Sequence, residues 1–190
     1  YNLFFSSINL LSLQSLGRRD IDDNIAKLKK VSGALQQILH SNSLIYILKL
    51  VKRIRNYINE GNRYVSDGIT LTVLDSLKDY RSPKHQGETM LSYLITFLMD
   101  KNPDALNVVE ELSLVPSANQ VDFESIRKEL NPIKTQMDAI MNLKKTATPL
   151  FVQRVTELEN DVGSTLTSAI SMVARCDTLS KEVMQGFGED

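Results

Sequence analysis

The stretch from Phe123 to Ile140 limits most strongly what this chain can fold into. Its apolar residues are separated by alternating steps of three and four: Phe123, Ile126, Leu130, Ile133, Met137 and Ile140. This spacing places one apolar seam along one side of a helix, as in a coiled coil. Pro132 lies within the seam, where it removes a backbone donor, and we expect it to bend the helix. Another helix has to cover such a seam.

Apolar residues at helical spacing recur along most of the chain. The first stretch, to Leu16, predicts an amphipathic helix whose partner surface lies elsewhere in the protein. Gly17 is expected to end it, and the acidic residues from Asp20 to start a second helix. Asn42 or Ser43 is the predicted N-cap of a third helix. Thr148 and Pro149 predict the start of a long last helix, which ends near Met184 and carries Cys176 on its apolar face.

Shorter patterns between these helices predict segments at about 71–77, 89–99 and 104–114, the last with Leu106, Val109 and Leu112 inward. Gly and Pro are scarce, at 8 and 5, and no segment alternates with a period of two. The fold class is therefore all-α: an elongated helical bundle with long coiled-coil helices and a compact knot of short helices. We expect a single module, with a helical segment at 1–60, a loop and short helices at 61–120, and long antiparallel coiled-coil helices at 121–190.

Charge and cysteine content limit the classes of partner and compartment. The net charge of −1 is unevenly distributed, at +6 over residues 1–65, −4 over 66–120 and −3 over 121–190. Such asymmetry can steer a charged partner, although solvated helix faces explain it equally. A single cysteine, Cys176, suits a reducing compartment and excludes an intramolecular disulfide. The chain begins at Tyr1, without Met, which indicates a piece of a longer protein.

The sequence contains no pattern typical of catalysis or metal binding. His40 and His85 have no Cys or His at ligand spacing, and Gly61 and Gly68 fit neither phosphate-binding nor dinucleotide motifs. We therefore expect no enzyme, no catalytic residue, no metal and no cofactor. The basic residues Lys49, Lys52, Arg53 and Arg55 lack the aromatic interleaving of single-strand binders, so a protein partner is favoured over nucleic acid. An anionic membrane surface is a weaker alternative for them, and no stable membrane insertion is expected.

Residues 56–82 interrupt the helical pattern with glycines and a cluster of Asn, Ser and Asp. Their sequence resembles the actin-binding formin homology two domain. The similar elements are Asn56-Tyr57-Ile58-Asn59-Glu60-Gly61, a loop with Arg63 and Gly68, a helix with Leu71, Leu74 and Leu77, and Asp79-Tyr80-Arg81-Ser82. Thr89-Met90-Leu91-Ser92-Tyr93-Leu94 and the terminal Phe187-Gly188-Glu189-Asp190 also resemble the family, so the similarity covers nearly the whole chain.

The resemblance implies the C-terminal half of such a domain, its coiled-coil and post region, without the lasso and the knob. In the family, a ring-shaped antiparallel dimer nucleates actin filaments and stays on their barbed ends, and a lasso carrying tryptophans wraps the partner's post. The present chain has no Trp. The resemblance implies cytoplasmic, cytoskeletal localisation, with actin and a second formin chain as partners.

The same resemblance assigns roles to individual residues. Asn56, Asn59, Gly61, Arg63 and Gly68 would form the post surface that receives the lasso. Arg81, assisted by Lys84, would contact the acidic surface of actin. The sequence departs from the family pattern at Arg55, where the family has Gly, and at Ile69, where it has an aromatic residue. These departures fall on the surface that would receive the lasso, and they affect the actin contact less. The alternative function is a structural helical scaffold or tether that retains the fold without actin assembly activity.

Overall fold

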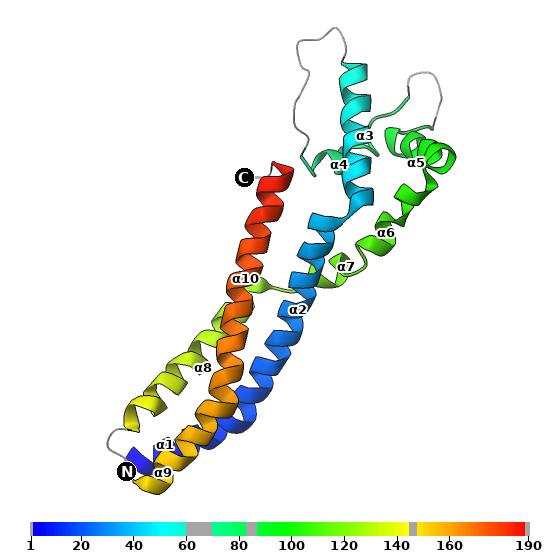
Figure 1. The fold of residues 1–190 in the computed structure, drawn as a ribbon. Coiled ribbons are helices and arrows are strands. Elements are labelled where there is room, and N and C mark those ends of the chain that lie inside the picture. The colour runs from blue at the N-terminus through cyan, green and yellow to red at the C-terminus, as the bar shows by residue number, and fades with distance from the viewer. Residues whose placement is uncertain (1, 60–69, 83–86, 145–147, 189–190) are drawn as a thin grey trace. The chain divides into compact units, whose positions relative to one another are not determined.

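The computed structural model describes residues 2–59, 70–82, 87–144 and 148–188, with side chains from residue 7 onward (Figure 1). Within these ranges the regular elements are helices, and one isolated backbone bridge joins Arg81 to Thr89. The predicted all-α class is confirmed. The chain divides into two compact units: unit 1 comprises Tyr1–Gly33 and Pro116–Thr178, and unit 2 comprises Ala34–Val115 and Leu179–Asp190.

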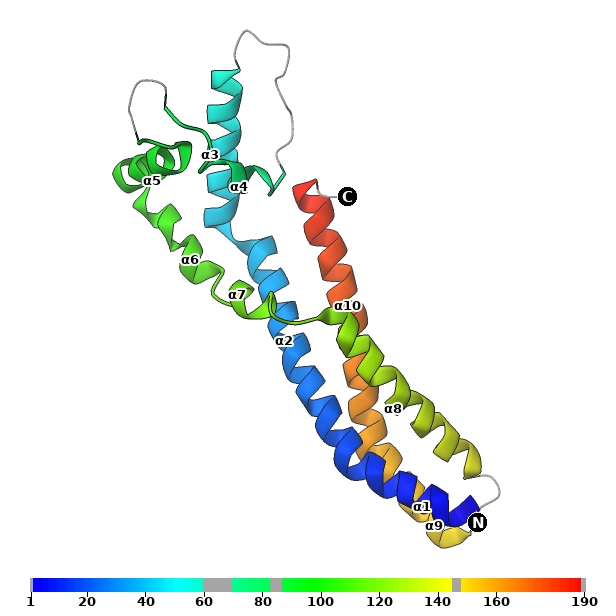
Figure 2. The ribbon, with the colours of Figure 1, turned by 180° about the vertical axis from the view of Figure 1, so that it is seen from behind.

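Unit 1 is built from three runs of helix. The first joins α1 (Asn2–Ser12), a π-helical segment η1 (Leu13–Gly17) and the start of α2 (Arg18–His40). The second is α8 (Phe123–Leu143). The third joins α9 (Pro149–Leu158), a π-helical segment η3 (Glu159–Gly163) and α10 (Ser164–Phe187) as far as Thr178. Both ribbon views show α8 running antiparallel to its two neighbours within the unit (Figures 1 and 2).

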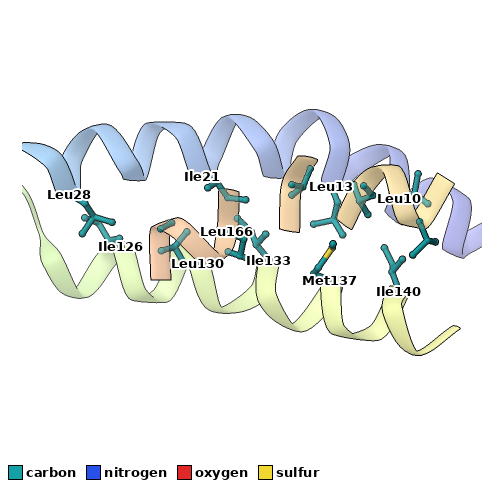
Figure 3. Close-up of a cluster of buried hydrophobic side chains, with 14 of the residues drawn as sticks. Leu10, Leu13, Ile21, Leu28, Ile126, Leu130, Ile133, Met137, Ile140 and Leu166 are labelled. Atoms are coloured by element: carbon teal, nitrogen blue, oxygen red, sulfur yellow. The ribbon is translucent and has the colours of Figure 1, made fainter. Parts of the chain in front are cut away.

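The predicted seam of α8 forms the centre of the unit 1 core (Figure 3). Ile126, Leu130, Ile133, Met137 and Ile140 are all buried, and Phe123 packs against the cluster. The partners from the other two runs are Leu10, Leu13, Ile21, Leu28, Phe151, Val155, Leu158, Val162, Leu166, Ala169 and Cys176. Each long helix therefore buries one apolar face against two others, as the three-and-four spacing requires.

Helix starts in unit 1 follow the sequence. The Asp122 carboxylate accepts hydrogen bonds from the backbone N–H groups of Glu124 and Ser125, at 3.0 and 3.2 Å. Pro149 occupies the first turn of α9, directly after Thr148. Proline suits this place because the first backbone donors of a helix have no partner within it. The predicted starts at Asp122 and Thr148 are confirmed.

The break predicted at Gly17 is wrong, because the helix continues through this residue. Gly17 ends η1, and Arg18 keeps the α-helical conformation. A π segment inserts an extra residue into the helical turn and shifts the faces that follow it. A Cβ at Gly17 would approach the Leu13 side chain at 3.1 Å, so the glycine gives room inside a continuous helix. Leu10 and Leu13 are buried in unit 1, whereas Ile8, Leu11 and Leu16 stay exposed.

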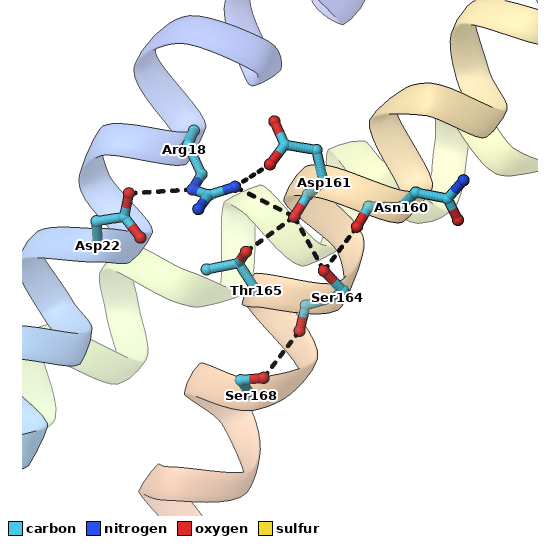
Figure 4. A network of polar contacts seen from close by, with 7 residues as sticks. All are labelled: Arg18, Asp22, Asn160, Asp161, Ser164, Thr165 and Ser168. Carbon is cyan, nitrogen blue, oxygen red and sulfur yellow. Dashed lines mark hydrogen bonds and ion pairs between the residues drawn. The ribbon is translucent and has the colours of Figure 1, made fainter.

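The last helical run contains a second π segment, η3, which the apolar pattern did not predict. Figure 4 shows the polar contacts around it. Arg18 donates to the carboxylate and the backbone carbonyl of Asp161, and its Nε donates to Asp22 at 3.0 Å. Ser164 and Thr165 donate to backbone carbonyls of Asn160 and Asp161 at 2.7 to 2.8 Å. Side-chain donors thus add to the backbone hydrogen bonds of this altered helical turn.

Unit 2 gathers short elements around one longer helix, α3 (Asn42–Ile58). They are α4 (Val73–Ser76), α5 (Met90–Lys101), a 3₁₀ turn η2 (Pro103–Asn107), α6 (Val108–Glu111) and the start of α7 (Val115–Ala118). The buried cluster of this unit consists of Val51, Leu77, Leu94, Leu98 and Ala105. Partly buried apolar residues from α3, α4 and α5 pack around it.

Ser41, rather than the predicted Asn42 or Ser43, caps α3. Its hydroxyl oxygen accepts a hydrogen bond from the Leu44 backbone N–H at 3.0 Å. The same hydroxyl donates to Glu111 at 2.5 Å, and the Ser43 hydroxyl donates to the other Glu111 oxygen at 2.5 Å. These hydrogen bonds, first Ser41 and then Ser43, lower the pKa of Glu111. One carboxylate therefore fixes the start of α3 to α6.

The single helix predicted at 104–114 is wrong. Residues 103–107 form a 3₁₀ turn, and α6 covers only Val108–Glu111. A 3₁₀ turn has three residues per turn, so it shifts the residues that follow it out of α-helical register. Val109, predicted to face inward, is 77% exposed, whereas Leu106 and Leu112 are partly buried.

Candidate protein-binding site

A groove of about 210 Å³ lies in unit 2 between the end of α3 and the residues of α4 and α5. Its apolar lining is Val51, Ile54, Ile58, Val73, Leu77, Met90 and Leu94. Polar groups are contributed by Arg55, Asn59 and Tyr80. An apolar floor with a few polar groups is the usual form of a site that accepts a side chain or a peptide.

Backbone pairing between residues 77–82 and 88–91 holds one wall of the groove. The N–H groups of Met90 and Leu91 donate to the carbonyls of Tyr80 and Leu77, at 2.8 and 3.1 Å. The Ser82 N–H donates to the Glu88 carbonyl at 2.9 Å. These bonds fix the segment that carries Tyr80 and Arg81 against the start of α5.

The start of α5 is itself fixed by a capping box. The Thr89 hydroxyl oxygen accepts from the Ser92 N–H at 3.1 Å, and the Ser92 hydroxyl oxygen accepts from the Thr89 N–H at 2.8 Å. This reciprocal arrangement satisfies two helix-end donors at once. Met90 and Leu94 consequently reach the groove from a helix whose first turn is well anchored.

The apolar stripe of α3 continues beyond the core of unit 2. Val51 is buried, Ile54 is partly buried, and Ile58 is 59% exposed although all three line the groove. Tyr57 and Tyr80 are also exposed, at 77% and 60%. Large apolar and aromatic side chains that cluster at a hollow indicate a surface for a partner.

The structure describes three of the seven residues predicted for the site. Asn59 lines the groove and ends α3, where its N–H donates to the Arg55 carbonyl at 3.0 Å. Asn56 is partly buried on the same helix. Arg81 is exposed, next to Tyr80, and shares the backbone bridge with Thr89. Gly61, Arg63, Gly68 and Lys84 lie outside the described residues. Asn59 thus lines the groove, and Arg81 directly follows the groove-lining Tyr80 along the chain.

Sequence reasoning missed most of the groove lining. Ile58, Val73, Tyr80 and Met90 were seen as parts of helical patterns or of a motif, and none was proposed as a contact. One signal was available, because the stripe of Val51 and Ile54 continues to Ile58 at the very end of α3. An apolar stripe that continues onto an exposed part of a helix is typical of a partner surface.

Chemical groups for catalysis do not gather at the groove. Among residues 2–59, 70–82, 87–144 and 148–188, no group of His, Cys, Asp and Glu has a metal-binding arrangement. Cys176 lies in the unit 1 core at 2% exposure, where burial raises the pKa of its thiol. Its Sγ donates to the Leu28 carbonyl at 3.7 Å. The interpretation of Cys176 as a small core residue is confirmed, and the groove is suited to binding.

Comparisons with known proteins identify the class of this chain. The sequence model of the Formin Homology 2 Domain matches residues 3–190. The chain is similar to Disheveled-associated activator of morphogenesis 1 of Homo sapiens, with 25% identity over 171 residues, which is 86% of this chain and 16% of that protein. It is also similar to Protein diaphanous homolog 3 of Homo sapiens, with 32% identity over 155 residues, 80% of this chain and 12% of that protein.

A third relative is Formin-G of Dictyostelium discoideum, with 25% identity over 177 residues, 92% of this chain and 16% of that protein. The chain belongs to the formin homology 2 domain family. It spans 12 to 16% of the length of these three relatives. In the part of the chain that the structure describes, no helix has the length and apolar character needed to cross a bilayer.

Proposed function

We propose that this chain is the actin-binding module of a formin-type factor that nucleates actin filaments and elongates them at the barbed end. The observation that carries the proposal is the family match over residues 3–190. The activity would rest on binding alone, because the described residues offer a groove and charged surfaces but no catalytic constellation. A cytoskeletal location follows from this function.

Within this proposal, the groove of unit 2 receives the lasso of a second formin chain. The exposed Ile58 and Tyr80 offer an apolar and aromatic surface to an inserted side chain. Asn59 and Arg55 supply amide and guanidinium donors at the edge of the lining. We assign Asn56, Asn59, Gly61, Arg63 and Gly68 to this contact surface.

Arg81, with Lys84, is proposed as the contact to the acidic surface of actin. Arg81 is exposed, and none of the ion pairs found among the described residues involves it. The backbone bonds at Tyr80 and Ser82 hold the Arg81 main chain in place. A charged side chain on a fixed backbone loses less conformational freedom when it pairs with a carboxylate, and this favours binding.

Single-filament actin elongation tests the proposal. The domain that contains this chain is compared as wild type and as Arg81→Glu, with persistence at growing barbed ends as the measurement. Reversing one interfacial charge is expected to shorten attachment at least roughly tenfold, equivalent to about 1.4 kcal/mol or more. Arg154→Glu is the matched control, because Arg154 is also exposed and lies on α9 in unit 1. It should leave attachment unchanged.

The competing function is a helical scaffold or tether that retains the fold without actin assembly activity. Arg55 and Ile69, at positions where the family has Gly and an aromatic residue, alter the surface on which formation of the ring depends. If the folded wild-type domain has no effect on filament growth, the proposed activity is wrong and the scaffold function takes its place. Equal losses from Arg81→Glu and Arg154→Glu would instead reject Arg81 as a specific contact.

A further inference from the structure

Helix α3 carries a concentrated positive charge. Its sequence, NSLIYILKLVKRIRNYI, contains Lys49, Lys52, Arg53 and Arg55 and no Asp or Glu. All its residues lie within the described part of unit 2. The positive charges of the helix are therefore not balanced by acidic residues one turn away, as they are on ordinary solvated helix faces.

Two of these cations share an exposed face with two tyrosines. Tyr46, Lys49, Arg53 and Tyr57 follow one another at steps of three, four and four, so they lie along one side of the helix. All four side chains are exposed, with Tyr57 at 77%. Leu44, Leu48 and Val51 occupy the buried side. Tyr46 and Tyr57 are separated by about 16 Å along the axis, from a rise of roughly 1.5 Å per residue.

Lys49 and Arg53 are not neutralised within the described structure. The ion pairs found there engage Arg18, Lys27, Lys101, Arg127 and Lys144. Acidic residues of unit 2 instead lie on other elements, such as Asp100 and Asp104, or bind hydroxyl groups, as Glu111 does. The exposed face of α3 is thus a basic surface whose charges are available to a partner outside unit 2.

We propose that this face, defined by Tyr46, Lys49, Arg53 and Tyr57, adsorbs onto the anionic surface of a phospholipid bilayer. A basic, amphipathic helix face attracts acidic headgroups. Tyrosine rings prefer the headgroup level of a membrane, where the ring is partly desolvated and the hydroxyl stays hydrated. The cations lie between the two rings along α3, so a flat charged layer can contact all four side chains. An acidic protein would satisfy the cations without using the exposed rings in this way.

Adsorption of this kind adds a location to the proposed function. The face lies on α3 but excludes the groove-lining residues Arg55, Ile58 and Asn59 and the proposed actin contact Arg81. Membrane contact and filament assembly therefore use different side chains. The proposal requires surface binding and no insertion, because a helix face of this composition is too polar to cross a bilayer.

Vesicle co-sedimentation of the full chain tests the proposal. The probes are vesicles of phosphatidylcholine alone and of phosphatidylcholine with phosphatidylserine. Binding is expected only to the anionic vesicles, and it should fall as the salt concentration rises from about 0.1 to about 1 M, where the Debye length shrinks from about 10 to about 3 Å. Each basic residue near the surface strengthens binding about fivefold, so Lys49→Gln with Arg53→Gln should weaken it about 25-fold.

Lys128→Gln with Lys134→Gln is the matched control. These residues are exposed on α8 in unit 1, and their replacement removes the same net charge. A circular dichroism melt of each double variant verifies that the fold is intact. Strong loss for the α3 pair with little change for the α8 pair supports the proposal. The proposal is wrong if both double variants lose vesicle binding equally, or if the wild-type chain binds neutral and anionic vesicles equally.

Actin-filament co-sedimentation provides the remaining outcome. If the α3 pair weakens binding to filaments and leaves vesicle binding unchanged, the face serves an acidic protein and the membrane proposal is wrong. The membrane proposal and the actin proposal can be tested separately, because the Arg81→Glu variant retains both Lys49 and Arg53. If the chain binds anionic vesicles and the domain that contains it never affects actin, the actin function is rejected and the membrane surface stays in place.

Discussion

The two units use their apolar residues differently. Unit 1 buries a continuous seam along three long helical runs, and Ile21, Ile126, Val155 and Val162 are fully enclosed. The buried cluster of unit 2 around Leu77, Leu94 and Leu98 is smaller, and Ile58 and Tyr80 stay exposed at a groove. Long helices with a regular seam favour stability, whereas short elements set at angles leave hollows that a partner can fill. Under the proposed function, unit 1 would give mechanical support and unit 2 would bind the partner.

Matched core truncations should give the largest difference between the units. Leu158→Ala in unit 1 and Leu98→Ala in unit 2 remove the same atoms at 1% and 2% exposure. We expect the free energy of unfolding to fall by about 4 kcal/mol for Leu158→Ala and about 2.5 kcal/mol for Leu98→Ala. The smaller core can relax around the cavity, and a long seam cannot. Urea denaturation measures both values, and an equal or greater loss at Leu98 would contradict the comparison.

A charge placed in the groove should weaken binding of the partner and preserve the fold. Ile58→Glu introduces a carboxylate at an exposed groove position, so stability should change by less than about 0.5 kcal/mol. Binding of a second formin chain should weaken by roughly 2 kcal/mol, since an apolar contact is replaced by a group that resists desolvation. Sedimentation equilibrium of the complete domain provides the affinity. Val109→Glu, at 77% exposure outside the groove lining, is the control and should dimerise normally.

Within unit 1, loss of a buried amide should lower the free energy of unfolding more than loss of an exposed amide. Asn24 is fully buried and donates from Nδ2 to the Glu129 carboxylate at 3.0 Å. Asn24→Ala should lower the free energy of unfolding by about 1.5 kcal/mol, because the buried hydrogen bond is lost. Asn142→Ala, at an exposed position of α8, should stay within about 0.5 kcal/mol of wild type. Similar effects at both sites in chemical denaturation would show that the Asn24 hydrogen bond contributes little.

Acid should weaken both units through one carboxylate in each. Hydrogen bonds from Ser41 and then Ser43 lower the pKa of Glu111, and those from Asn24 and then Ser125 lower the pKa of Glu129. Because each folded-state pKa lies below the unfolded value of 4.5, the stability from these groups is complete above that pH. It is lost as the pH falls through the folded pKa.

The measurement is the unfolding midpoint as a function of pH. Glu111→Gln and Glu129→Gln should each reduce the decline below pH 4.5, since a neutral amide cannot titrate. Asp138→Asn, exposed on α8, is the control and should follow the wild-type curve. If the unfolding midpoint falls below pH 4.5 as steeply in Glu111→Gln as in wild type, the Ser41 and Ser43 hydrogen bonds are not the cause of the fall.

Much of the fold could be predicted because its signals are local. The seam from Ile126 to Ile140, the cap at Asp122 and the start at Pro149 all follow from side-chain spacing or from helix-end chemistry. Cys176 was placed on an apolar face by the same periodicity, and it is buried. Membership of the family could also be inferred from the order of motifs around residues 56–94, and the comparison confirms it. The assignment of one module, with a helical segment at 1–60, a loop and short helices at 61–120 and long helices at 121–190, stays a prediction.

Local spacing could not show where helices change their winding. The sequence indicated a break at Gly17 and a regular helix at 159–163, but π segments occur at both places. Their stability depends on distant partners, such as Arg18 bonded to Asp161, more than 140 residues away along the chain. Ser41 likewise became the cap of α3 through its contact with Glu111, which no pattern within residues 40–44 contains.

The sequence by itself determined the helical class, the long seams, the family and the absence of acidic residues from α3, since these depend on residue type and spacing. Tertiary structure alone decided that Ile58 and Tyr80 meet at one groove and that, among the residues the structure describes, Lys49 and Arg53 form no ion pair. Residues separated by a loop can share a surface only after the elements that carry them have packed, and packing depends on the whole set of buried contacts rather than on any one segment.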